Sequence, residues 1–194
     1  MQQIQDAIAL KQALLQDEAL LARIRQVIDR CVDCFQNDGK VLFCGNGGSA
    51  ADAQHLAAEL SGRFYFDRPP LFAEALHVNT SYLTAVGNDY GYEASFARMA
   101  EAMLRKGDVI FLMSTSGKSP NILRAAEVAK KADAFLIGMT GQGGGELADL
   151  VDILLPMPST DTPRIQEGHM LVGHIICEEV EKKIFFSQLG FAQL

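Results

Sequence analysis

The chain has 194 residues, 48% of them hydrophobic and 21% charged, which is ordinary for one globular domain with a substantial core. Its net charge of −7 argues against a protein that follows a nucleic-acid backbone, although a small anionic substrate could still bind through local groups. The sequence contains no apolar run near the roughly 20 residues of a membrane span, and its N-terminus lacks the pattern of a signal peptide. We therefore expect a cytoplasmic protein that binds neither nucleic acid nor a membrane.

Helical and strand patterns alternate along the chain. Apolar residues recur at helical spacing from Leu21 to Phe35, until the segment Asn-Asp-Gly at 37–39 ends the pattern. This predicts an N-terminal helical extension over residues 1–38, with a break near residues 16–18. Short apolar runs predict five buried strands, over residues 41–44, 71–78, 109–113, 134–139 and 151–156.

Further helices are predicted between these strands and after the last one, over residues 49–62, 80–105, 120–132, 145–150 and 164–187. An alternation of strands and helices predicts an α/β fold in which a parallel sheet carries helices on both faces. In such a sheet, ligands bind at the carboxyl ends of the strands, where the loops gather.

The loop GNGGS, residues 45–49, follows the first predicted strand. Its glycines let the backbone approach a ligand, and Ser49 is predicted to cap a helix whose N-terminus attracts an anion. The longer pattern G-x-G-x-x-A is formally compatible with a dinucleotide site, but such a site expects an acidic residue at the end of the second strand, and the second predicted strand ends in His77-Val78-Asn79. A tight turn that binds no ligand is the alternative.

The loop STSGKS, residues 114–119, follows the third predicted strand. It does not fit a nucleoside-triphosphate loop, because Leu112 stands where that motif requires glycine. A helix is predicted to start at Pro120, with Ser119 as its cap. The hydroxyls and backbone N–H groups of the loop, together with the start of this helix, can bind a phosphate. Turns that bind no ligand also contain such residues. The hydroxyls belong to Ser114, Thr115, Ser116 and Ser119. A third loop, TGQGGG at residues 140–145, is assigned no chemistry.

Polar residues on two predicted helices could meet in one site. His55 and Glu59 stand four residues apart on the helix that starts from GNGGS, beside an apolar stripe. On the last helix, Gln166 and His174 fall along one side, whereas His169 aligns with apolar residues and is interpreted as structural. The four aligned residues can be interpreted as a divalent-metal site, because histidine nitrogen and carboxylate or amide oxygen are zinc ligands. A solvated helix face with an incidental His–Glu pair is the alternative.

Four motifs, CGNGGSAADAQHLAAELSGRF, VGNDYG, STSGKS and RIQEGHMLVGH, together resemble the phosphoheptose isomerases of the sugar-isomerase (SIS) domain family. The resemblance runs through nearly all of the chain, and the motifs keep their order. It implies a single SIS domain over residues 1–194, a three-layer sandwich with a five-stranded parallel sheet, and a homotetramer. It also implies conversion of sedoheptulose 7-phosphate to D-glycero-D-manno-heptose 7-phosphate, toward the activated heptose of lipopolysaccharide core or other surface glycans.

The resemblance implies roles for individual residues. Glu59 and His174 match the acid/base pair. One zinc ion per subunit is implied at positions matching His55, Glu59, Gln166 and His174. Substrate contacts are implied at Asn46, Gly47, Gly48, Ser49, Glu59, Asn88, Asp89, Ser114, Thr115, Ser116, Ser119 and Gln166. Of these, Asn88 and Asp89 match a segment that a neighbouring subunit often supplies.

One residue departs from the family pattern. Some family members carry an aspartate near the substrate, where this chain has Pro163. The role of that aspartate is therefore absent here or filled from Asp161 or elsewhere.

Some SIS-domain relatives are not enzymes but sugar-phosphate sensors or a replication-initiation partner. Such a protein would keep the phosphate loops but could lose the acid/base pair, so the presence of both Glu59 and His174 favours the enzyme.

Aldose–ketose interconversion moves a proton between C1 and C2, most simply through a cis-enediol. We expect Glu59 to abstract and return the carbon-bound proton, and His174 to exchange protons at the oxygens or to open the sugar ring. The two roles could also be reversed.

Overall fold

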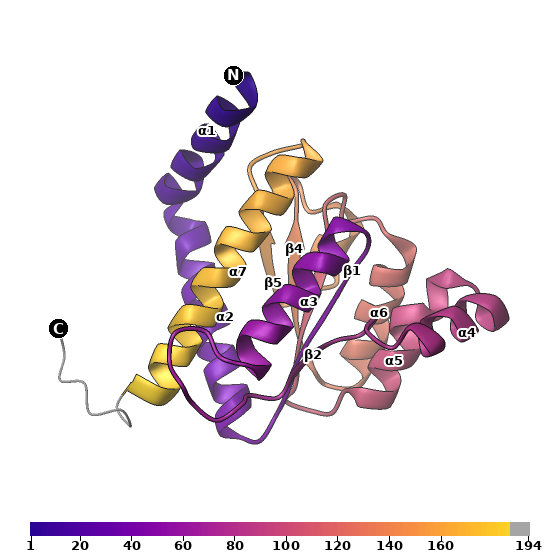
Figure 1. Ribbon diagram of the computed structural model, residues 1–194. Helices are drawn as coiled ribbons and strands as arrows, with labels where there is room; N and C mark the ends of the chain where they lie inside the picture. Colours follow the sequence, from indigo (N-terminus) through magenta and orange to yellow (C-terminus); the bar gives the residue numbers. More distant parts are fainter. Residues whose placement is uncertain (187–194) are drawn as a thin grey trace.

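The computed structural model describes residues 1–186 of the chain and contains one β-sheet (Figure 1). Its five strands lie in the order β2-β1-β3-β4-β5, and every neighbouring pair is parallel. Their bounds are β1 Val41–Gly45, β2 Ala73–Ala75, β3 Val109–Ser114, β4 Phe135–Thr140 and β5 Ile153–Pro156. The predicted parallel five-stranded sheet is confirmed.

Helices cover both faces of the sheet, which gives the three-layer sandwich that was expected (Figure 1). Successive residues of a strand point to opposite faces, so Val41 and Phe43 pack on one side of the sheet, and Leu42 and Cys44 on the other. The first layer consists of α1 Gln2–Gln16, α2 Glu18–Gln36, α3 Gly48–Ser61 and α7 Thr162–Phe185. The second consists of α5 Ser95–Met103 and α6 Pro120–Lys131.

The N-terminal extension consists of two helices that meet at Asp17. The side chain of Asp17 accepts a hydrogen bond from the backbone N–H of Leu20 at 2.9 Å, which is the capping geometry of a new helix start. The predicted break near residues 16–18 is therefore confirmed. Among the described residues, no helix combines the length and the apolar character needed to cross a membrane.

Three elements differ from the prediction. The helix predicted over residues 80–105 is divided into α4 Thr80–Tyr90, the 3-10 turn η1 Tyr92–Ala94 and α5, because Gly91 adopts a φ of 82° that no helix continues through. The helix predicted over residues 145–150 is the 3-10 helix η2 Gly145–Asp149. Strand β2, at the sheet edge, is shorter than predicted. Residue 187, at the end of the last predicted helix, lies outside the described residues.

The chain changes sides between β1 and β3, which are neighbours in the sheet. Strand β1 leads to α3 on one face and β3 leads to α6 on the other, so the loops after these strands diverge. The two strand ends are in register, with Gly45 opposite Met113. A divergence of this kind opens a crevice at the carboxyl edge of a parallel sheet, where ligands bind. The GNGGS and STSGKS loops both lie there.

Candidate active site

Helices α3 and α7 pack side by side (Figure 1). A Cβ atom on Gly173 would lie 2.5 Å from Leu56 Cδ1, so the Leu56 side chain fills the space that the glycine leaves open. Farther along, the Cys177 thiol lies 3.9 Å from the carbonyl oxygen of Leu56. This contact brings together the polar edges of two helices that are more than 100 residues apart in the chain.

The polar edges meet in a compact group of His55, Glu59 and His174. The Nε2 atom of His55 lies 3.1 Å from Glu59 Oε1 and 3.1 Å from His174 Nε2. The metal-ligating atoms of the three residues all lie within 4.8 Å of one another. The acid/base pair that the sequence suggested is thus brought into one group.

This group fits a divalent metal ion. A neutral imidazole Nε2 carries at most one hydrogen, so His55 Nε2 cannot donate to both of its neighbours, whereas all three groups can direct lone pairs at one cation. Tetrahedral zinc with bonds of about 2.0–2.1 Å separates its ligand atoms by about 3.3 Å, close to the two shortest separations seen here. Histidine and carboxylate ligands are a donor set that zinc accepts.

Gln166 lies at the other end of the helix pair. A Cβ atom on Gly48 would lie 2.4 Å from the Gln166 amide nitrogen, so this side chain contacts the first turn of α3. His55 lies seven positions after Gly48, which is about 10 Å of helical rise. Gln166 is therefore placed beside the GNGGS loop, and the grouped ligand atoms belong to His55, Glu59 and His174.

Helix α3 has its N-terminal cap position two residues earlier than predicted, at Gly47 instead of Ser49. Gly47, with a φ of 57°, is the residue that precedes the helix, and no side chain caps this end. Ser49 is instead buried inside the first turn, where its backbone N–H donates to the carbonyl of Asn46 at 3.0 Å. The prediction that Ser49 caps the helix is wrong, because the positive φ of Gly47 completes the turn before it.

Asn46 is held by a partner that sequence analysis missed. The side-chain amides of Asn46 and Asn121 exchange two hydrogen bonds of 2.9 Å, and the Tyr92 hydroxyl donates to Asn46 Oδ1 at 3.0 Å. Asn121 is buried in the first turn of α6, so this pair joins the GNGGS loop to the helix after the serine loop. The only signal in the sequence was a polar residue directly after Pro120.

The serine loop, residues 114–119, is ordered by its own hydroxyls. Ser114 Oγ lies 3.0 Å from Ser119 Oγ and accepts a hydrogen bond from the N–H of Gly117 at 3.2 Å. Ser116 Oγ accepts from the N–H of Lys118 at 3.2 Å. Ser119 does occupy the position before α6, as predicted, but its hydroxyl caps no backbone group there. Thr115 and Ser116 are at least partly exposed at the carboxyl edge of the sheet.

The TGQGGG loop packs directly against the serine loop. The N–H of Gly141 donates to the carbonyl of Thr115 at 2.9 Å, and the N–H of Leu147 donates to that of Gly117 at 3.0 Å. Gly117 has a φ of 65°, and a Cβ atom there would lie 1.9 Å from the carbonyl oxygen of Gly144. Gly117 in one loop and Gly145 in the other, where a Cβ atom would lie 2.5 Å from the carbonyl oxygen of Ser116, are therefore required for a close backbone contact, a role that composition alone did not reveal.

Two expected site segments lie away from the His55 group in this chain. Asn88 and Asp89 are exposed at the end of α4, where the amide of Asn88 donates to the carboxylate of Asp89 at 2.8 Å. Helix α4 packs against η1 and α5 rather than against α3 and α7. At the start of α7, Pro163 lies in the first turn and Asp161 precedes it, exposed and with no capping hydrogen bond from its side chain.

Two further ionisable residues lie near this region. His169 is fully buried with Nε2 3.1 Å from the carbonyl oxygen of Thr140, and burial lowers its pKa to about 4, which supports the structural interpretation. Asp52 lies one turn before His55. Burial raises the pKa of Asp52, against the opposing effect of His55, and one of its carboxylate oxygens has no hydrogen-bond partner among the described residues.

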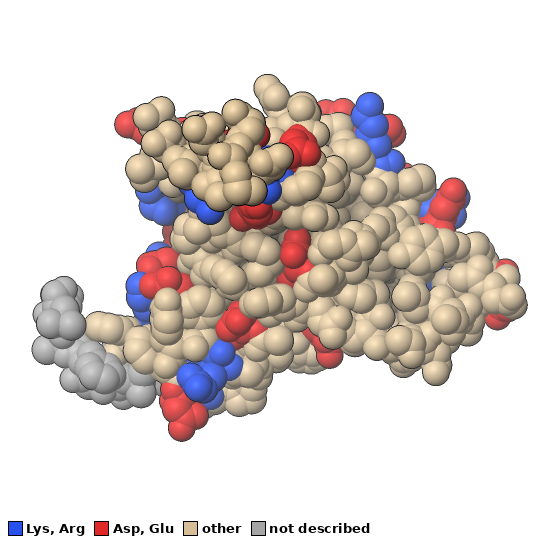
Figure 2. Space-filling view, turned by 45° about the horizontal axis from the view of Figure 1, so that its top comes forward, with Lys and Arg blue, Asp and Glu red and all other residues tan. Residues whose placement is uncertain are grey.

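The charges on the surface are mixed. On the face shown in Figure 2, acidic and basic side chains are interspersed among uncharged ones. Lys and Arg side chains of the described residues form no broad basic surface on this face.

The chain is similar to known proteins over most of its length. A family model described as the SIS domain matches residues 4–141. A phosphoheptose isomerase of Burkholderia pseudomallei is 54% identical over 185 residues, which cover 95% of this chain and 94% of that protein. Solved structures of phosphoheptose isomerases from Neisseria gonorrhoeae and Francisella tularensis match with TM-scores of 0.87 and 0.90, at 41% and 37% identity, and each match covers 93% of this chain and 95% of the other. The chain therefore belongs to the SIS-domain family, among its phosphoheptose isomerases, and is a sugar-phosphate isomerase.

Proposed function

We propose that the protein converts sedoheptulose 7-phosphate to D-glycero-D-manno-heptose 7-phosphate, with Glu59 and His174 as the acid/base pair. The observation that supports this most is the meeting of these two residues beside His55, although 115 positions separate them in the chain. The names of the similar proteins point to the same phosphorylated sugar class.

The phosphate group is proposed to bind at the serine loop. Hydroxyls of Ser114, Thr115, Ser116 and Ser119, together with N–H groups of the loop and the start of α6, supply hydrogen-bond donors and a favourable helix dipole. The start of α3 and the amide of Gln166 lie at the same edge of the sheet. About 10 Å of helical rise separates this start from His55, a distance over which an extended heptose phosphate places its reacting carbons beside Glu59.

The proton transfers follow from the two groups at the far end. Glu59 removes a proton from C1 of the ketose, which gives an enediol, and returns it to C2 to form the aldose. His174 takes the proton from the C1 hydroxyl and delivers one to the oxygen at C2, so that no proton is gained or lost overall. General acid–base catalysis of this kind contributes about 10²- to 10⁴-fold per group.

We further propose one zinc ion per subunit, held by His55, Glu59 and His174. Gln166, which the resemblance implies as a fourth ligand, contacts the first turn of α3 instead, so the fourth position stays open. When bound, zinc would polarise the substrate oxygens and stabilise negative charge on the enediol. A Glu59 carboxylate that held the ion would not be free to act as the base without rearranging. Three protein ligands and an open position are typical of catalytic zinc sites, and the partial exposure of all three grouped side chains leaves room for substrate.

Glu59→Gln and His174→Gln test the acid/base assignment, with Glu127→Gln on the exposed side of α6 as the matched control. We expect each site variant to lose at least 100-fold in kcat with an unchanged circular dichroism spectrum, and the control to keep full activity. Product formation from sedoheptulose 7-phosphate, followed by NMR with and without a chelator, measures this. Near-normal turnover in a purified site variant would remove that residue from the catalytic role.

We also propose a homotetramer in which α4 of one subunit completes the site of another. The exposed position of Asn88 and Asp89, away from α3 and α7 of their own chain, supports this arrangement. Mixing two inactive variants, Asp89→Asn and Glu59→Gln, by joint refolding should restore part of the activity, because some sites then combine intact residues from both chains. If the mixture stays inactive while light scattering shows a tetramer, the shared site is contradicted.

A further inference from the structure

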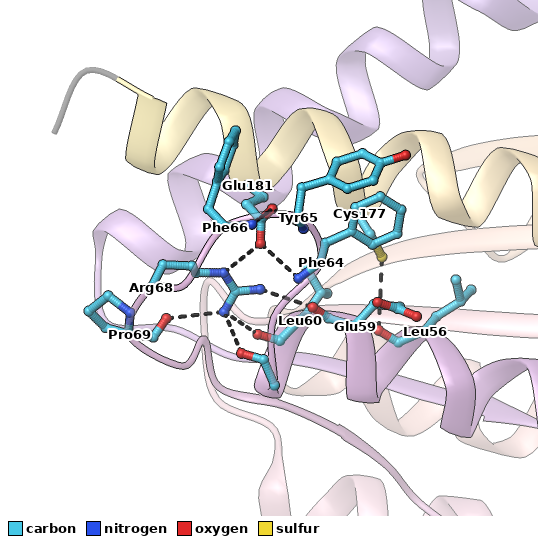
Figure 3. A network of polar contacts seen from close by, with 11 residues as sticks. Leu56, Glu59, Leu60, Phe64, Tyr65, Phe66, Arg68, Pro69, Cys177 and Glu181 are labelled. Carbon is cyan, nitrogen blue, oxygen red and sulfur yellow. Dashed lines mark hydrogen bonds and ion pairs between the residues drawn. The ribbon is translucent and has the colours of Figure 1, made fainter. Parts of the chain in front are cut away.

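A buried carboxylate outside the catalytic group, that of Glu181, lies near the C-terminal end of α7. Glu181 is fully buried, and its two oxygens accept four hydrogen bonds (Figure 3). Three come from consecutive backbone N–H groups, those of Phe64 at 2.9 Å, Tyr65 at 2.6 Å and Phe66 at 3.0 Å. The fourth comes from Arg68 Nε at 2.8 Å. The carboxylate therefore fixes the chain segment that follows α3.

Arg68 distributes its remaining hydrogens over the end of α3 (Figure 3). Its Nη1 donates to the carbonyls of Leu60 at 2.7 Å, Pro69 at 3.0 Å and Gly62 at 3.2 Å, and its Nη2 donates to the carbonyl of Glu59 at 2.9 Å. The last carbonyls of a helix have no partner within the helix and carry partial negative charge, so a cation stabilises them. One of these carbonyls belongs to the proposed catalytic base.

These contacts connect the two helices that carry the proposed acid/base pair. Glu181 lies seven residues after His174 on α7, which is two helical turns along the same side. The ring of Phe64, whose N–H is bound to Glu181, lies 5.8 Å from the ring of His174. The structure assigns to Arg68 and Glu181 the role of positioning residues, which set the spacing between Glu59 and His174 and so the affinity for the metal ion. This inference rests on the proposed function of that group.

A purely stabilising role would not require this pair. Removing two charges from water costs about as much as their attraction returns, and well-packed apolar residues often serve equally well. Burial raises the pKa of Glu181, but the three backbone N–H groups and Arg68 outweigh it, so the pKa stays below its ordinary value and the carboxylate is charged at neutral pH. The hydrogen bonds of the pair instead specify one geometry for seven main-chain groups within residues 59–69, at the end of α3 and in the segment that follows it, and tie them to Glu181 of α7.

Glu181→Gln and Arg68→Lys test the inference, with Asp108→Asn as the matched control. Asp108 is also a buried carboxylate that accepts backbone N–H groups, from Lys40 at 3.0 Å and Arg105 at 2.7 Å, and it pairs with the Lys40 ammonium at 2.6 Å. It precedes β3, at the edge of the sheet opposite the serine loop. We therefore expect Asp108→Asn to lower the stability of the fold but to leave the geometry of the His55, Glu59 and His174 group unchanged.

The measurements are zinc affinity, by competition with a chromophoric chelator, and kcat and KM separately. We expect Glu181→Gln and Arg68→Lys each to bind zinc 10- to 100-fold more weakly and to lose at least tenfold in kcat, with KM changed less than threefold. Loss of residues that orient metal ligands commonly has effects of this size. The control should change none of these by more than threefold. The double variant R68M/E181Q leaves no buried unpaired charge, so it should fold even if the single variants do not, and show the same losses.

Equal zinc affinity and kcat in the double variant and in Asp108→Asn would overturn the positioning role. Glu59→Gln measured in parallel separates this result from a failure of the proposed function. If Glu59→Gln keeps its activity, the catalytic assignment itself is wrong. If it loses activity while the double variant does not, only the role of Arg68 and Glu181 is wrong.

Discussion

Replacing Gly117 with alanine should displace the serine loop while leaving the sheet intact. Any residue other than glycine costs roughly 1–2 kcal/mol in the left-handed conformation that Gly117 adopts at φ 65°. In addition, the new Cβ atom would lie 1.9 Å from the Gly144 carbonyl oxygen, whereas such contacts are essentially never below 3.0 Å. The Cβ atom is bonded rigidly to the main chain of one loop and the carbonyl oxygen belongs to the main chain of the other, so neither can rotate away and the two loops have to part by about 1 Å.

A displacement of this size can reduce a rate by about 100-fold, which corresponds to about 2.7 kcal/mol of transition-state stabilisation. Gly107→Ala is the matched control, because Gly107 also has a positive φ, of 88°, but a Cβ atom there meets nothing within 4 Å. The control therefore carries the backbone strain without the collision. We expect kcat/KM of Gly117→Ala to fall about 100-fold and KM to rise, with kcat/KM of Gly107→Ala within threefold of the parent.

The assay is initial-rate formation of the aldose from sedoheptulose 7-phosphate over a range of substrate concentrations, with thermal unfolding of both variants as a check on folding. Equal kcat/KM values in the two variants would refute the reasoning, because the contact between the serine loop and the TGQGGG loop would then have no effect on phosphate binding.

Three further outcomes are expected. His169 has a pKa of about 4 in the folded protein and about 6.5 when unfolded, so the unfolded state binds the proton first as the pH falls. The free energy of unfolding should therefore fall by up to about 3 kcal/mol as the pH drops from about 6.5 to about 4. Urea unfolding of His169→Gln should show a correspondingly flatter pH dependence, and a pH dependence equal to that of the parent would contradict this. Leu56→Ala removes a side chain that is 1% exposed between α3 and α7 and should cost about 2–5 kcal/mol in urea unfolding, whereas Leu15→Ala, at a position that is 74% exposed, should cost less than about 0.5 kcal/mol. His55→Gln should weaken zinc binding at least tenfold in chelator competition, and an affinity equal to that of the parent would exclude His55 as a ligand.

Much of the site could be predicted because its signals are local. His55 and Glu59 are four residues apart, so a helix places them on one side whatever surrounds it. The buried strands are short apolar runs, and each of the glycine and serine loops follows such a run directly, which puts both loops at the carboxyl edge of a parallel sheet. The break between α1 and α2 was predictable for the same reason, since Asp17 caps the second helix through a group three residues away.

Other features depend on contacts between distant segments. Residue patterns describe backbone geometry poorly, and three element boundaries depended on it. These are the length of β2, the end of α4 at Gly91 and the early start of α3 at Gly48. The bond between Asn46 and Asn121 spans 75 positions, and neither residue predicts the other. The packing of the TGQGGG loop on the serine loop likewise required knowledge of where two chain turns come together.

The periodicity of apolar residues determines which elements form and which face of each is buried, because that choice is made within a few residues of the chain. It does not determine which helices become neighbours at atomic distance. Only the tertiary structure shows that the absence of a side chain at Gly173 lets α7 approach Leu56, and that this approach brings His174 within 3.1 Å of His55. The physical reason is that close packing depends on the shapes of both partners at once, and these partners lie 117 or more positions apart in the sequence.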